Sequence, residues 1–99
     1  MEIVDDLLSR VRACTKEHEF FKYLNEDMPG VAVEIAKSTH ATARILENLT
    51  RYPSIIVRHE VAKNPQTSQV TLERLSEDKD MLVRDYARRT LISLGHLPK

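Results

Sequence analysis

The sequence predicts an all-α fold built from short helix pairs that repeat along the chain. Two glycines and 5% aromatic residues among 99 residues fit helices better than a sheet protein. Apolar positions also recur with a 26-residue period, which matches two short helices with their turns. Together these observations predict one domain, a short α-solenoid of about three 26-residue two-helix repeats with helical caps.

The repeat is found by comparing the chain with itself after a 26-residue shift. Without any gap, the shift superimposes Ala36-Lys37 on Ala62-Lys63, Leu46-Glu47 on Leu72-Glu73, Ile55-Ile56 on Met81-Leu82 and Val57-Arg58 on Val83-Arg84. One period earlier the match is weaker, with Phe20 in the place of Leu46 and Val31 in the place of Val57. The chain therefore divides into a leader (1–9), repeats 10–35, 36–61 and 62–87, and a C-terminal cap (88–99).

Short polar residues mark the expected helix starts, because their side-chain oxygens can accept the free N–H groups of a first turn. The expected starts are Thr15, Pro53-Ser54, Thr67 or Ser68, and Asp78 or Asp80, with Pro29 as the first residue of another helix. These signals predict helices over residues 17–25 and 43–49, after residue 54, after residue 67 or 68, and after residue 78 or 80. Asn64-Pro65 and Gly95 are expected to end helices.

A family resemblance rests on Val57-Arg58-His59-Glu60-Val61-Ala62-Lys63-Asn64-Pro65, followed by Leu72, Leu75, Asp78, Asp80, Val83 and Arg84. This stretch resembles the leucine-rich repeat variant family, which is similar in style to HEAT repeats. The resemblance implies short alternating helices wound into a right-handed superhelix, and it does not imply an enzyme. Some members hold an iron–sulfur cluster on a cysteine-rich segment, but this chain has only Cys14 and cannot supply four thiolates.

Candidate chemistry is sparse. Cys14 and His18 are four residues apart, as a metal pair on a helix would be, and His40 falls at the position of Cys14 one repeat later. Zinc needs three or four ligands, so neither a metal nor another cofactor is expected. No phosphate-binding loop or nucleophile motif occurs, and we expect no enzyme activity.

Charge is uneven although the formal net charge is zero. Residues 1–35 hold eight acidic and four basic side chains, whereas residues 79–99 hold two acidic and five basic ones. This uneven distribution of charge favours a partner that binds in one orientation. The alternative is that the charges simply lie on faces exposed to solvent. The acidic start lacks the features of a signal peptide and no apolar run could span a membrane, so we expect a cytoplasmic location and no membrane partner.

The favoured function is a non-catalytic protein-interaction module that acts as an adaptor, scaffold or inhibitor of a larger complex. The expected partner-binding residues lie on the second helices of the repeats: Arg58, His59, Arg84, Asp85, Arg88 and Arg89. The alternative is a nucleic-acid-binding solenoid that uses the arginines as a basic ridge, which the zero net charge disfavours. Two structural alternatives also stay open. Asp78 and its acidic neighbours would pair with Arg58 or Arg84, and Ile92, Leu94 and Leu97 would mediate self-association.

Overall fold

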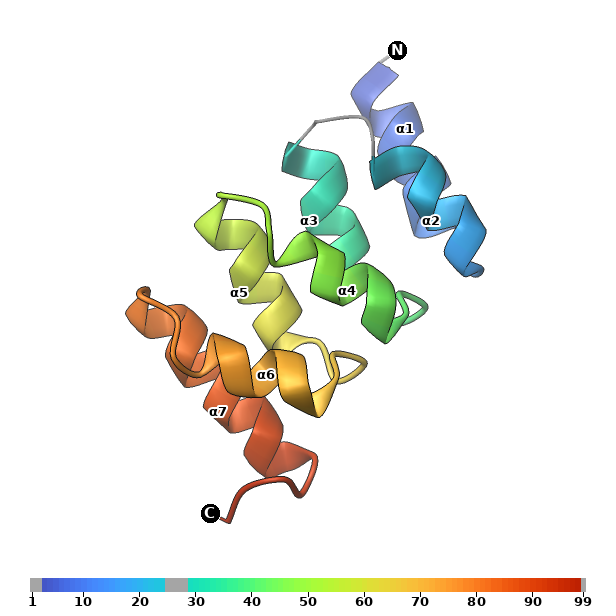
Figure 1. Cartoon of the computed structure of the whole chain (residues 1–99). Coiled ribbons are helices and arrows are strands. Elements are labelled where there is room, and N and C mark those ends of the chain that lie inside the picture. The colour runs from blue at the N-terminus through green and yellow to red at the C-terminus, as the bar shows by residue number, and fades with distance from the viewer. Residues whose placement is uncertain (1–2, 25–28, 99) are drawn as a thin grey trace.

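The computed structural model describes residues 3–24 and 29–98, and this part of the chain forms seven α-helices and no strand (Figure 1). Side chains are described for residues 7–24 and 30–98. The helices are α1 (Ile3–Arg12), α2 (Glu17–Leu24), α3 (Pro29–Lys37), α4 (Ala43–Leu49), α5 (Ile55–Lys63), α6 (Gln69–Leu75) and α7 (Met81–Ser93). The prediction of an all-α fold is confirmed.

The helix starts recur with the period of the sequence. Helices α1, α3, α5 and α7 begin at residues 3, 29, 55 and 81, and helices α2, α4 and α6 begin at residues 17, 43 and 69. Every step in both series equals the 26-residue period. The predicted repeat boundaries at residues 35/36 and 61/62 fall inside α3 and α5. The helix spacing fits any boundary with this period, and the division into 10–35, 36–61 and 62–87 stays a prediction.

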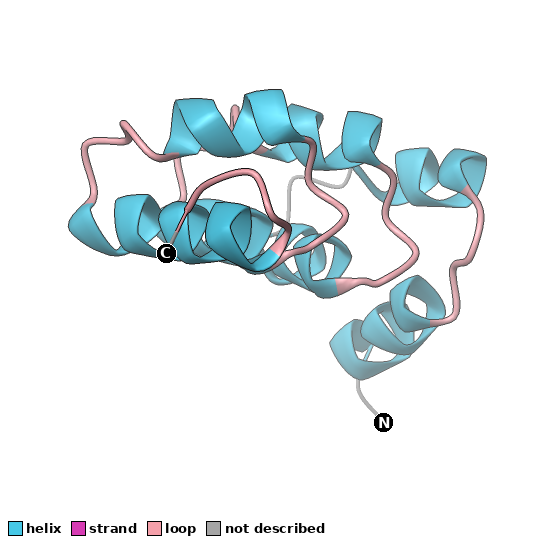
Figure 2. Cartoon of the chain, turned by 90° about the horizontal axis from the view of Figure 1, so that it is seen from below, coloured by secondary structure: helices cyan, strands magenta, loops and turns pink. Residues whose placement is uncertain are grey.

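The helices form two layers, seen edge on in Figure 2. Helices α3, α5 and α7 lie side by side in one layer, with α1 beside α3 at the N-terminal end (Figure 1). Helices α2, α4 and α6 form the other layer and pack against the first. The molecule measures 47 × 24 × 19 Å, and α1 and α7 lie at opposite ends of its long axis (Figure 1).

The core lies between the layers and follows the sequence repeat. Phe20, Leu46 and Leu72 hold equivalent positions on α2, α4 and α6, and all three are fully buried. The opposite layer contributes an equivalent series of buried valines, Val31, Val57 and Val83. Burying one side chain of this size stabilises a fold by roughly 1.5–3 kcal/mol. The recurring apolar positions are therefore the positions that join the two layers.

Four helices begin with a side-chain cap. Thr42, Ser54, Ser68 and Asp80 each accept the N–H of the residue three positions later. Of the predicted alternatives, Ser68 rather than Thr67 and Asp80 rather than Asp78 is the cap. Thr67 has another partner, because its hydroxyl donates to the carbonyl of Val61 at 2.7 Å.

The remaining helix ends include one correction. Pro29 is the first residue of α3, Asn64 ends α5, and Gly95 follows α7 with a φ of 83°, all as predicted. Thr15 is not the cap of α2. The Glu19 carboxylate instead accepts the N–H groups of residues 15 and 16, at 3.0 and 3.2 Å, and so ties the segment that precedes the helix to its first turn. The predicted end of this helix at Asn25 lies outside the described residues.

Candidate functional site

Neighbouring helices of the α3–α5–α7 layer are joined by the same bond in successive repeats. Asn64 Nδ2 donates to the carbonyl of Ala36 at 2.8 Å, and Thr90 Oγ1 donates to the carbonyl of Ala62 at 2.6 Å. The two donors are one repeat period apart, and so are the two acceptors. We call these contacts the cross-helix bonds. They use carbonyls in the last turn of a helix, which have no intrahelical partner.

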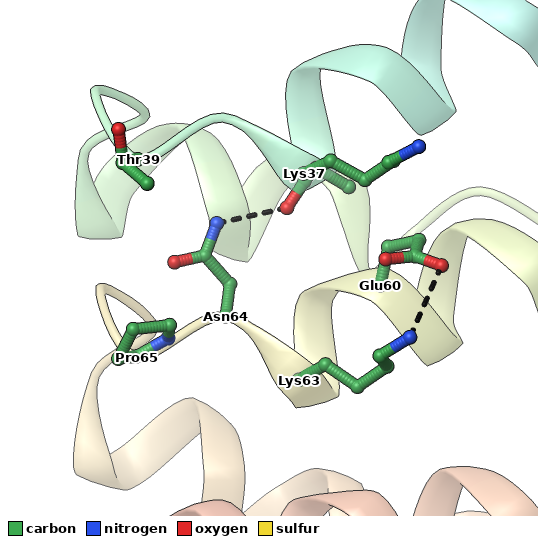
Figure 3. A pocket seen from close by; sticks show the side chains of 7 residues that line it. Lys37, Thr39, Glu60, Lys63, Asn64 and Pro65 are labelled. Carbon is green, nitrogen blue, oxygen red and sulfur yellow. Dashed lines mark hydrogen bonds and ion pairs between the residues drawn. The ribbon is translucent and has the colours of Figure 1, made fainter.

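The first cross-helix bond lies at the cleft drawn in Figure 3, which has a volume of about 240 Å³. The polar groups around it are mostly engaged with one another. Asn64 Nδ2 also donates to the carbonyl of Ser38 at 2.9 Å, and Lys63 pairs with Glu60 at 3.7 Å. No described side-chain polar atom that is buried lacks a hydrogen-bond partner. The geometry of this cleft therefore supports a structural role.

Arg58, a predicted partner-binding residue, lies inside the protein with 8% of its surface exposed. Its guanidinium pairs with the Asp78 carboxylate at 2.9 Å and donates to the carbonyls of Tyr52 and Pro53 at 3.4 and 3.2 Å. These contacts tie α5 to the loop that precedes α7. Arg58 thus forms the structural ion pair with Asp78 that the sequence analysis gave as an alternative. Little of its surface is open to a partner.

His59 holds the start of α7. Its Nε2 lies 2.9 Å from Oδ2 of Asp80, the N-cap of α7, and its ring meets the ring of Tyr86 edge to face at 5.7 Å. The hydrogen bond with His59, followed by the one from the backbone N–H of Val83, lowers the pKa of Asp80 below its ordinary value of 3.8. The carboxylate therefore stays charged at neutral pH and caps the helix.

The other four predicted residues lie on the last helix, α7. Arg84 donates to the carbonyl of Asp78 at 2.7 Å, and Arg89 pairs with Asp85 at 3.0 Å. The Arg89 and Asp85 side chains are 72% and 47% exposed, and Arg88 is exposed as well. We call Arg84, Asp85, Arg88 and Arg89 the α7 outer face.

The α7 outer face can be compared with the equivalent positions one repeat earlier, on α5. The equivalents of its four residues on α5 are Arg58, His59, Ala62 and Lys63, and each of these contacts α7 or the loop before it. Arg58 and His59 bind Asp78 and Asp80, the Ala62 carbonyl accepts from Thr90, and Lys63 lies over the Tyr86 ring at 5.3 Å. On α5 this set of positions holds the next helix, and on α7 the same positions are partly or fully exposed.

The sequence analysis missed an apolar edge at the starts of α5 and α7. Ile55, Ile56, Met81 and Leu82 are 45%, 59%, 70% and 49% exposed. Adjacent apolar residues gave no signal for this edge, because the adjacent pair Ile45 and Leu46 on α4 is fully buried. An open cleft of about 390 Å³ lies beside this edge.

Metal chemistry has no support in the described part of the chain, where no three His, Cys, Asp or Glu side chains gather to hold an ion. Cys14 is 5% exposed and donates to the Arg10 carbonyl at 3.4 Å, and burial raises the pKa of its thiol. His18 and His40 are both exposed. The tail residues Leu94 and Leu97 are 38% and 40% exposed, and Ile92 is half-buried.

Comparison with known proteins gives no relative. No family model, curated protein or solved structure matches the chain. The resemblance to the leucine-rich repeat variant family therefore stays a prediction. Among the described helices, none combines the length and the apolar character that crossing a membrane requires.

Proposed function

We propose that this chain is a non-catalytic protein-interaction module built as a short right-handed α-solenoid. Three helix pairs, α2–α3, α4–α5 and α6–α7, would be the repeats, with α1 and the end of α7 as caps. The 26-residue spacing of helix starts and the two equivalent cross-helix bonds support this architecture. The proposal includes a cytoplasmic location and a role as adaptor, scaffold or inhibitor.

The binding surface in this proposal is the α7 outer face. The observation that carries it is the equivalence with α5, where the same four positions contact a neighbouring helix or its loop. A surface that receives a helix in one repeat has a shape suited to receive a helix in the next. The proposed partner therefore presents a helix that packs alongside α7.

The side chains define the chemistry of that helix. Arg88 stands where α5 has the small residue Ala62, and it is an exposed cation for which no described residue forms an ion pair. A carboxylate on the partner helix would pair with it, whereas a basic partner would be repelled. Arg58 is left out of the surface because it is buried against Asp78.

Affinity capture from source cells tests the proposal, with and without nuclease, using the wild type, the variant Arg88→Glu/Arg89→Glu and the control Lys22→Glu. Lys22 is exposed on α2, at the other end of the molecule (Figure 1). We expect a protein that the wild type and Lys22→Glu recover and that the double variant loses. Equal recovery by all three would reject the α7 outer face. Recovery that collapses on nuclease treatment would favour the nucleic-acid-binding alternative instead.

A further inference from the structure

The apolar edge repeats the same chemistry at the starts of two neighbouring helices of one layer, α5 and α7. Its four aliphatic side chains occupy the first two positions of α5 and α7, and each keeps nearly half or more of its surface in water. Exposed apolar residues scattered singly need no explanation, but a contiguous group marks a contact surface. In Figure 1 the starts of α5 and α7 lie next to one another along one side of the molecule.

The loops before these two helices begin with the same turn. Arg51 N–H donates to the carbonyl of Asn48 at 3.2 Å, and Glu77 N–H donates to the carbonyl of Arg74 at 3.1 Å. A hydroxyl supports each loop in the same way, from Thr50 and Ser76 to the carbonyls three residues before them, both at 2.6 Å. Residues 51 and 77 therefore occupy equivalent places.

These equivalent places carry opposite charges. Arg51 and Glu77 are both exposed, and neither takes part in an ion pair within the described part of the chain. Between the two loops lies the open cleft lined by Pro53, Ile55 and Lys79 among others. The edge thus combines two apolar pairs with the cation Arg51 beside α5, and with the anion Glu77 and the exposed cation Lys79 beside α7.

We propose that the apolar edge is an interface with a second copy of this chain. The two copies would be related by a two-fold axis that passes between the loops and runs from one helix layer toward the other. This axis exchanges the α5 edge with the α7 edge, so Ile55 faces Met81 of the second copy and Ile56 faces Leu82. Arg51 of each copy then faces Glu77 of the other, and the pair forms twice.

Charge selects this arrangement over the alternative two-fold arrangement. An axis that ran along the row of helices would place Arg51 against Arg51 and Glu77 against Glu77, and like charges would repel. A self-complementary edge of this kind specifically suits a second copy. Two helix starts per copy form a small contact compared with the roughly 1,600 Å² of a standard interface, so the dimer should be weak and concentration-dependent.

Sedimentation equilibrium across a wide concentration range tests the charge pairing. Arg51→Glu should raise the dimer dissociation constant roughly tenfold, because two favourable pairs become two repulsive ones. The double variant Arg51→Glu/Glu77→Arg should restore dimerisation, since each pair is re-formed with its signs exchanged. A wild-type chain that stays monomeric at every concentration, or a double variant as weak as Arg51→Glu, would overturn the proposal.

The apolar pairs have matched controls. Ile56→Ser/Met81→Ser should abolish the dimer, whereas Val70→Ser should leave it unchanged, although Val70 is 71% exposed on α6. Leu97→Ser, in the tail, should also have no effect, and loss of the dimer in this variant alone would place self-association there and reject the edge. Thermal melts by circular dichroism confirm that each variant is folded. The α7 outer face shares no residue with this edge, so failure of either proposal leaves the other standing.

Discussion

Asn64 offers the sharpest test of how the repeats are joined. Its side chain is 5% exposed and makes three hydrogen bonds: two donated, to the carbonyls of Ala36 and Ser38, and one accepted, from the N–H of Gln66 at 2.9 Å. At about 1 kcal/mol for each bond, Asn64→Ala should lower the free energy of unfolding by about 3 kcal/mol. For a domain of this size that corresponds to a fall in Tm of roughly 12–24 °C.

Asn64→Asp separates the donated bonds from the accepted one. An aspartate keeps the size of the side chain and can still accept from Gln66, but its charged oxygens would face the carbonyls of Ala36 and Ser38. We expect it to destabilise the protein at pH 7 at least as much as alanine does. Only the protonated carboxyl can donate, so the folded state should raise the pKa of this group. The lost stability should therefore return in part as the pH falls from 7 to 5.

Urea denaturation followed by circular dichroism measures both effects, with Gln66→Ala as the control. Gln66 has an exposed amide side chain two residues away, and its replacement should change the free energy of unfolding by less than about 0.5 kcal/mol. If Asn64→Ala and Asn64→Asp both remain within about 1 kcal/mol of the wild type, the cross-helix bond does not hold the helices together and the reasoning is wrong.

Three further predictions concern stability. Arg58→Ala leaves the nearly buried Asp78 carboxylate without its ion-pair partner and should lower the free energy of unfolding by about 3 kcal/mol. A Tm within a few degrees of the wild type would show that the guanidinium has no structural role. Because the hydrogen bond with His59 lowers the pKa of Asp80, the stability it supplies is present above pH 3.8 and is lost as the pH falls through the lowered pKa. Acid titration of the urea midpoint should therefore show a shallower decline for Asp80→Asn, and equal slopes would contradict this. Gly95→Ala should lower the free energy of unfolding by about 1 kcal/mol, because the φ of Gly95 is 83°. Gly30→Ala lies on a helix with nothing within 4 Å of the added carbon, and it should raise that free energy by up to about 1 kcal/mol. Thermal melts that shift both variants in the same direction would refute the contrast.

The sequence analysis predicted local structure well. Residues 43–49 form a helix with the expected bounds, and Ser54 and Asn64 begin and end α5 as predicted. These features follow from local chemistry, namely a hydroxyl near free N–H groups and a proline after the last turn. Thr15 was the exception, because α2 begins at Glu17 and Lys16 rather than Thr15 directly precedes the helix.

The surfaces were predicted less well. Arg58 and Arg88 both read as exposed cations in the sequence, yet one is buried against Asp78 and the other lies in solvent. The difference depends on position in the stack, because the face that bears Arg58 on α5 packs against the next helix, and the equivalent face of α7 does not within the described residues. The sequence analysis placed both residues on one expected binding surface, because it could not tell which helix face packs against a neighbour.

The helices, their 26-residue spacing and the apolar positions that join the layers follow from the amino-acid order, because caps, helix breakers and helical periodicity act within a few residues. Which polar groups meet across the repeats depends on how whole helices pack, as Asn64 and the Ala36 carbonyl 28 residues earlier show. The same packing leaves Ile55, Ile56, Met81 and Leu82 facing water. A residue's burial depends on which neighbour packs against its face, and that neighbour is set by the arrangement of helices rather than by adjacent residues.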